Sequence, residues 1–179
     1  KYLSQEIKKI KNNDTDLNPE IINDGTSDII NLILIKYENN FPLNSEINYL
    51  KDIYGNTKSE IFEKIEVLLL KPYNGHIYLE NLFIRESDVF FKDKLKNESN
   101  FFINEIFLPY ITISPATENN VDEDSVKLIK EIKNNIKNNK IISAYEKINN
   151  IKEFKESFSK SKVEMEKYIE FKTQLNNLI

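Results

Sequence analysis

The 179-residue sequence contains no cysteine, one histidine and three glycines, and each scarcity excludes a kind of site. Without cysteine the chain has no disulfides, thiolate zinc sites or cysteine nucleophiles. His76 and Glu80, one helical turn apart, supply too few ligands for a structural zinc site. The scattered Gly25, Gly55 and Gly75 cannot form a phosphate-binding loop. We therefore expect no bound metal, no cofactor and no enzymatic activity, with a carboxylate pair as the one catalytic arrangement left open.

Long apolar runs and excess positive charge are also missing. The longest apolar run, residues 29–35, is interrupted by Asn31 and is far shorter than the roughly 20 residues of a membrane-spanning helix. The chain opens at Lys1 without the apolar core of a signal peptide and without methionine, so we expect any lipid anchor to lie upstream. A net charge of −4 and a pI near 5.3 argue against nucleic acid or an anionic membrane as the main partner.

The apolar residues that are present recur at helical spacing between the prolines and glycines. We predict an all-α fold, an irregular bundle of about six to eight helices in a single domain over residues 1–179. Residues 1–18 are expected to form a flexible or tether-proximal segment. Asn18 should cap a helix that begins at Pro19, and Gly25 should mark a turn. The spacing predicts helices over residues 2–11, 29–37, 45–54, 58–71, 76–94, 99–108, 122–138 and 141–179, with a strand as the alternative for residues 29–37 because of their β-branched content.

Two helix starts carry capping residues. Asn44 or Ser45 is expected to cap the short helix that ends at Tyr54. Thr57 and Glu60 match a capping box, with threonine as N-cap and glutamate three residues later. Both patterns predict that side-chain oxygens accept hydrogen bonds from the first free backbone N–H groups.

The helix over residues 76–94 is apolar around most of its circumference, which is typical of a buried helix. We predict that it is the most buried element, with Leu82, Phe83, Val89 and Phe90 inside. Arg85, the only arginine, lies within it. It either forms a buried ion pair, for example with a neighbouring acid, that fixes the packing of the helix, or it anchors a partner.

The C-terminal segment, residues 141–179, has an apolar stripe longer than one ordinary helix. It forms either one long helix or a helix pair broken near residues 157–159, where serine is a weak helix former and a good cap. An unbroken helix would leave part of the stripe exposed and would then pair with a partner, so an oligomer is possible in that case.

Two charged clusters are candidate sites. Asp122, Glu123 and Asp124 either bind calcium or, as the first turn of a helix, complement its dipole. A lysine stripe is the best candidate for an anionic ligand such as a sulfated glycan, a nucleic acid or an acidic protein, with a solvated helix face as the alternative. Aromatic residues for base stacking are not interleaved there. The stripe consists of Lys127, Lys130, Lys133, Lys137 and Lys140.

The usage of Ile, Asn and Lys, the absence of cysteine and the polar opening resemble the plasmid-encoded helical surface lipoproteins of Borrelia spirochetes. The stretch from Ile53 to Glu66 resembles a helix of the CspA-like family, and the length is closer to that of the EppA/BapA group. The resemblance implies a protein of the bacterial outer surface that binds a host macromolecule such as a complement regulator. The alternative is an intracellular, cytoplasmic scaffold or assembly subunit that pairs through its C-terminal helix.

Overall fold

A computed structural model describes residues 19–98 and 123–179. Helices make up 86% of this part of the chain, and it contains no strand, which confirms the all-α prediction. The helices expected over residues 2–11 and 99–108 lie outside the described residues. The elements are α2 (Pro19–Glu38), α3 (Asn44–Tyr54), the 3₁₀ helix η1 (Gly55–Lys58), α4 (Ser59–Leu70), α5 (His76–Glu98), α7 (Glu123–Lys137), α8 (Ile141–Asn150), α9 (Lys152–Ser157) and α10 (Ser159–Asn176).

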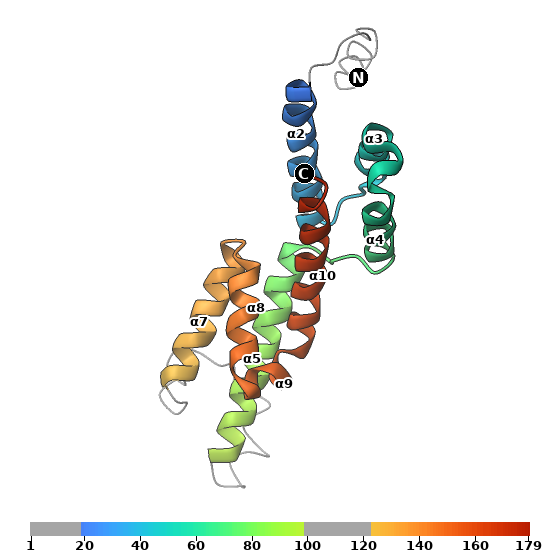
Figure 1. The fold of residues 1–179 in the computed structure, drawn as a ribbon. Coiled ribbons are helices and arrows are strands. Elements are labelled where there is room, and N and C mark those ends of the chain that lie inside the picture. The colour runs from blue at the N-terminus through green and yellow to red at the C-terminus, as the bar shows by residue number, and fades with distance from the viewer. Residues whose placement is uncertain (1–18, 99–122) are drawn as a thin grey trace.

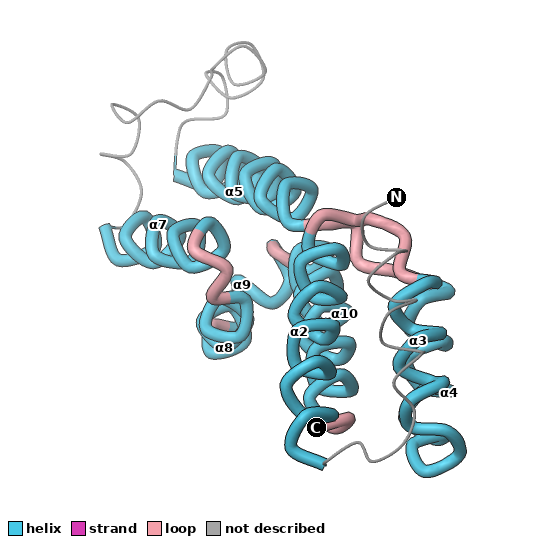
Figure 2. Tube along the Cα trace, turned by 90° about the horizontal axis from the view of Figure 1, so that it is seen from above, coloured by secondary structure: helices cyan, strands magenta, loops and turns pink. Residues whose placement is uncertain are grey.

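Helix α10 lies at the centre of the arrangement (Figures 1 and 2). It contacts α4 on one side and α5 and α8 on the other, and Tyr37 of α2 stacks on its Phe171 with ring centroids 3.8 Å apart. Its apolar residues Met165, Tyr168 and Leu175 are buried together with Phe171. The prediction that residues 76–94 form the most buried element is therefore wrong, because α10 holds that place.

Helix α5 is buried along one face only. Phe83 and Phe90 are inside, as predicted, but Leu82 is half-buried and Val89 is 58% exposed. Arg85 is also exposed, and no ion pair joins it to a residue of the described chain, so the prediction of a buried ion pair is wrong. The apolar residues around the helix exceed what its neighbours α7, α9 and α10 can cover.

The C-terminal segment is folded back on itself. After α8 the chain breaks at Ile151, runs through α9, and breaks again at Phe158 before α10 returns beside α8 (Figure 1). Phe158 is fully buried and stacks on Phe83, with centroids 4.8 Å apart. The expected break near residues 157–159 is confirmed, and the apolar stripe of the segment is buried within the chain.

A carboxylate from another helix stabilises the second break. Glu86 of α5 accepts hydrogen bonds at 3.0 Å from the backbone N–H groups of Lys160 and Ser161, one on each of its oxygens. These N–H groups lie in the first turn of α10, where no residue of the helix itself can satisfy them. A negative charge there also complements the helix dipole. Glu86 thus caps α10 from outside and positions it against α5.

Helices α2 and α7 end in the same way, with a pair of asparagines. The second of each pair, Asn40 and Asn139, has a left-handed φ of 56°. Backbone N–H groups donate back into the last turn at 3.1 and 2.8 Å in α2 and at 2.9 and 2.8 Å in α7, which is the Schellman pattern. The first of each pair, Asn39 and Asn138, donates its side-chain amide to the carbonyl four residues back. Asparagine thus takes the position that glycine usually occupies.

Of the predictions for helix starts and turns, the one for Pro19 is confirmed and those for Gly25 and the N-caps are wrong. Pro19 begins α2 as expected, but Gly25 lies inside that helix rather than at a turn. The expected caps are wrong by one residue or more: Leu43 and Lys58 occupy the N-cap positions of α3 and α4, and neither makes a side-chain cap bond. Thr57 donates its hydroxyl to the carbonyl of Tyr54 instead, which closes η1. Thr57 lies inside the 3₁₀ helix η1, and α4 begins only at Ser59, so Thr57 is not at the N-cap position of α4.

Candidate functional site

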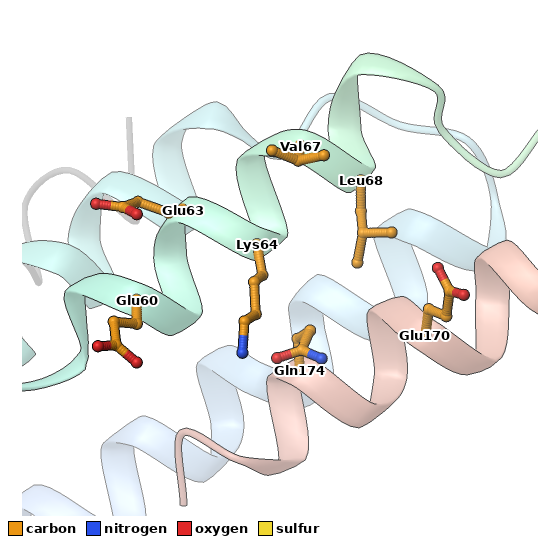
Figure 3. Close-up of a pocket in the computed structure, with 7 residues that line it drawn as sticks. All are labelled: Glu60, Glu63, Lys64, Val67, Leu68, Glu170 and Gln174. Atoms are coloured by element: carbon orange, nitrogen blue, oxygen red, sulfur yellow. The ribbon is translucent and has the colours of Figure 1, made fainter.

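A groove of about 770 Å³ opens between α4 and α10. Figure 3 shows its two walls, with Lys64 of α4 reaching towards Gln174 of α10 and Glu170 pointing from α10 towards Leu68. We call this surface the α4–α10 groove. Its lining residues are Glu60, Glu63, Lys64, Val67, Leu68, Glu170 and Gln174.

The α4 wall of the groove is apolar at its C-terminal end. Val67 is 65% exposed, and Leu70, one turn further along the same face of α4, is 81% exposed. The opposite face of α4 buries Phe62 and Ile65 in the core. Exposed leucine and valine side chains are common singly, but a pair beside a groove is typical of a surface that receives a partner.

The charge around the groove is mostly negative. Glu60 and Glu63 on α4 and Glu170 on α10 provide three carboxylates, and Lys64 is the one cation among the lining residues. This groove was not among the sites predicted from the sequence. The signal available was the apolar run from Val67 to Leu70, which is too continuous for a single buried helix face and must therefore expose part of itself.

A second polar site lies in the interior, where Tyr37, Tyr73 and Tyr168 form a tyrosine cluster. The ring centroid of Tyr73 lies 5.7 Å from that of Tyr37 and 5.5 Å from that of Tyr168. The Tyr37 hydroxyl accepts a hydrogen bond from the Tyr73 backbone N–H at 3.2 Å, and the Tyr168 hydroxyl donates to Glu38 at 2.7 Å. The Tyr73 hydroxyl is buried and makes no hydrogen bond within the described residues.

Burial is the main cause of the shifted pKa values in this cluster. It raises the pKa of Tyr37 to about 12, partly offset by the hydrogen bond from the Tyr73 backbone. Burial likewise raises the pKa of Tyr73, and repulsion from Tyr168 in its ionised form and from the carboxylates of Glu164 and Glu38 adds to the shift. The pKa of Tyr168 is raised first by burial and then by its hydrogen bond to Glu38. All three groups therefore remain neutral hydroxyls at physiological pH.

The cluster joins elements that are distant in sequence. Glu38 accepts a second hydrogen bond, from the Asn139 side chain at 2.6 Å, so the ends of α2 and α7 meet there. Gly75, with φ of 95°, lies so close that a Cβ would approach Asn40 Cβ and the Glu38 carbonyl at 3.3 Å. Every one of these bonds is internal to the fold, so we interpret the cluster as a structural junction rather than a reactive site.

Buried Glu164 of α10 holds the adjoining loop. It accepts a hydrogen bond from the Asn74 backbone N–H at 3.1 Å and pairs with Lys167 at 2.5 Å. Lys167 also donates to the Pro72 carbonyl at 3.4 Å. The loop between α4 and α5 is thereby attached to α10.

The lysine stripe proposed from the sequence is brought together at the edge of the molecule. Lys127, Lys130, Lys133 and Lys137 lie on α7, and Lys140 follows at the start of α8; all five are exposed. The opposite face of α7 buries Ile129, Ile132 and Ile136. We call these five residues the lysine face.

The other residues singled out in the sequence are dispersed. His76 begins α5 and is half-buried. Glu123 and Asp124 form the first turn of α7, and Asp122 lies outside the described residues. Within the described ranges, no three acidic or histidine side chains are grouped so that they could hold a metal ion. No described helix is long and apolar enough to cross a membrane.

Comparison with known proteins finds no relative: no protein-family model, no curated protein and no solved structure matches the chain.

Proposed function

We propose that this protein is a non-enzymatic binding protein and that the α4–α10 groove receives an amphipathic helix with a basic flank from a partner protein. The observation that carries the proposal is the coincidence of exposed Val67 and Leu70 with a groove framed by glutamates. The resemblance to spirochete surface lipoproteins supports a bacterial outer-surface location and a host protein as the partner.

The shape of the groove favours a helix as the occupant. It is bordered by two helices, α4 and α10, and is open along its length (Figure 3). A helix laid in such a groove buries an apolar stripe with a repeat of three and four residues. Val67, Leu68 and the aliphatic stem of Lys64 provide the complementary apolar surface.

The charges favour a basic partner. The carboxylates of Glu60, Glu63 and Glu170 outnumber the ammonium group of Lys64. Lysine or arginine residues beside the apolar stripe of the partner would pair with them, whereas an acidic flank would be repelled. Charge complementarity therefore selects among helices that have the same apolar face.

The second candidate, a scaffold that pairs through the C-terminal helix, has less support. Met165, Phe171 and Leu175 of α10 are buried in the same chain and are not available to a second copy. Of the apolar side chains in this helix, Val163 is the largely exposed one, at 50%. The α4–α10 groove, lined by Val67 and Leu68, therefore offers a partner more apolar contact than the exposed surface of α10 does.

The test uses three labelled peptides that share one apolar helical face and carry lysine, glutamine or glutamate flanks. Fluorescence anisotropy with the full chain should show binding of the lysine-flanked peptide, at least about tenfold weaker binding of the glutamate-flanked peptide, and an intermediate value for glutamine. Equal binding of all three would exclude charge selection at the groove.

Matched variants locate the binding surface. Val67→Asp should abolish binding of the lysine-flanked peptide, whereas Ile142→Asp, at an exposed position of α8, should leave it unchanged. Glu63→Lys should weaken binding, and Glu146→Lys, another exposed glutamate, should not. Because all four positions are exposed, each variant should fold, which circular dichroism checks. Equal losses at the groove and control positions would contradict the proposal.

A further inference from the structure

We propose that the lysine face is a second binding site, separate from the α4–α10 groove, and that its ligand is a sulfated polysaccharide. Figures 1 and 2 place α7 at the edge of the molecule, beyond α5 and α8 and on the far side of α10 from α4. The two surfaces can therefore be occupied independently.

The helix geometry gathers the charges on one side. Lys127, Lys130, Lys133 and Lys137 fall within about a third of the circumference of α7 and extend over about 15 Å along its axis. The Schellman turn continues this row: the Lys140 backbone N–H donates to the Asn135 carbonyl at 2.8 Å. That bond keeps Lys140 next to the last turn of α7 instead of carrying it away with α8.

Among the described residues, Lys133, Lys137 and Lys140 form no ion pair with an acidic group. Glu131, at its margin, is already paired with Lys147 of α8 at 2.8 Å. That hydrogen bond is the main reason why the pKa of Glu131 is lowered, so the carboxylate stays ionised and engaged. Asp124 is exposed in the first turn of α7, away from the C-terminal lysines. In the part of the chain that the structure describes, the C-terminal end of α7 thus presents the ammonium groups of Lys133, Lys137 and Lys140 without a paired carboxylate.

The remaining exposed side chains indicate the class of ligand. Between the lysines the surface carries the amides of Asn134 and Asn138, and α7 contains no aromatic residue. Single-stranded nucleic acid is bound by aromatic stacking combined with charge, and the stacking part is missing here. A chain of sulfate and hydroxyl groups needs only what is present, namely point charges and amides that donate and accept hydrogen bonds.

The net charge of −4 determines how binding of a polyanion depends on distance and on salt. The whole molecule repels a polyanion at long range, so binding depends on the local row of cations. An interaction of this kind releases condensed counterions and weakens steeply as salt concentration rises.

The test measures binding of a size-defined, labelled heparin oligosaccharide to the full chain by anisotropy over a salt series. Two variants carry the same loss of four charges. One replaces Lys127, Lys133, Lys137 and Lys140 with glutamine. The control replaces four other exposed lysines with glutamine, namely Lys71, Lys152, Lys155 and Lys160.

The lysine-face variant should bind heparin at least about tenfold more weakly and with a shallower dependence on salt. The control variant should bind within about twofold of the unchanged protein. Equal losses in both variants would overturn the proposal, because bulk charge alone would then explain binding. Tighter binding of single-stranded DNA or polyglutamate of equal charge would also overturn it, as would absence of heparin binding at low salt.

Discussion

The tyrosine cluster allows one chemical change to be made at two positions with opposite expected effects. Tyr73→Phe and Tyr168→Phe each remove a single buried hydroxyl and leave the ring in place. The Tyr168 hydroxyl donates to Glu38 at 2.7 Å, whereas the Tyr73 hydroxyl has no hydrogen-bond partner in the described structure. Because the ring volume is unchanged, no cavity of appreciable size complicates the comparison.

The expected changes in the free energy of unfolding follow from the hydrogen bonds that each hydroxyl makes. A hydrogen bond to a charged group contributes about 1.5–3 kcal/mol, so Tyr168→Phe should lower the free energy of unfolding by about 2 kcal/mol. A buried polar group without a partner costs about 1–3 kcal/mol, so Tyr73→Phe should raise the free energy of unfolding by about 1 kcal/mol. Tyr37→Phe should fall between them, because Tyr37 makes two bonds, both longer than 3 Å, to uncharged backbone groups.

Urea unfolding followed by circular dichroism measures these differences as shifts of the midpoint at constant slope. A stability loss in Tyr73→Phe as large as that in Tyr168→Phe would refute the reasoning. It would mean that the Tyr73 hydroxyl has a partner, such as a buried water molecule, that contributes as much as Glu38 does.

Three further measurements test the packing and electrostatics. Phe158→Ala should lower the free energy of unfolding by about 3–5 kcal/mol, because it empties a fully buried site, whereas Val89→Ala on exposed α5 surface should change it by less than about 0.5 kcal/mol. Glu86→Ala should cost about 1–2 kcal/mol in the same urea assay by removing the external cap of α10, and exposed Glu146→Ala should cost little. Stability should fall as the pH rises above about 10, since the unfolded tyrosines lose protons there while the buried ones retain them, by up to about 1.4 kcal/mol per pH unit for each tyrosine. Tyr37→Phe should make this decline shallower up to about pH 12, where the folded Tyr37 itself titrates.

Helix content and the fold-back could be predicted from the sequence because both depend on local patterns. The spacing of Ile129, Ile132 and Ile136 identified the buried face of α7, and the serines around Phe158 marked the break before α10. These signals lie within a few residues of the features they specify. They do not depend on which helices pack together.

The degree of burial could not be predicted in the same way. Val89 and Phe90 are adjacent apolar residues, yet one is 58% exposed and the other is 4% exposed, because only one side of α5 is covered. The cap of α10 comes from Glu86, which is more than 70 residues away along the chain. The α4–α10 groove likewise requires two helices that the sequence does not pair.

The asparagine pairs are an intermediate case. Asn39-Asn40 and Asn138-Asn139 each end a helix by the same bonds, whereas Asn134-Asn135 lies inside α7, so an asparagine pair alone does not identify a helix end in this chain. In a sequence this rich in asparagine the signal is easily treated as compositional. Its meaning becomes clear once the left-handed φ values and the backward hydrogen bonds are known.

The attachment of the segment formed by α3, η1 and α4 has a consequence for amide hydrogen exchange. This segment contributes Ile47, Leu50 and Phe62 to the common core, and it contacts the rest of the bundle along one side, through α2 and α10. Lys58 contributes one such tie, donating to the Asn177 carbonyl at 3.0 Å. A unit of this kind opens at a lower free energy than the whole molecule, so its amides exchange sooner than those of α10.

The α4–α10 groove lies along the contact between this segment and α10. A partner that contacts both walls would have to be released before the segment formed by α3, η1 and α4 could separate, so its binding free energy adds to the cost of local opening. Exchange in α4 would slow while exchange in α7, on the other side of the bundle, stayed the same. Protection of one helix would then report occupancy of the groove even when the partner causes no change of shape.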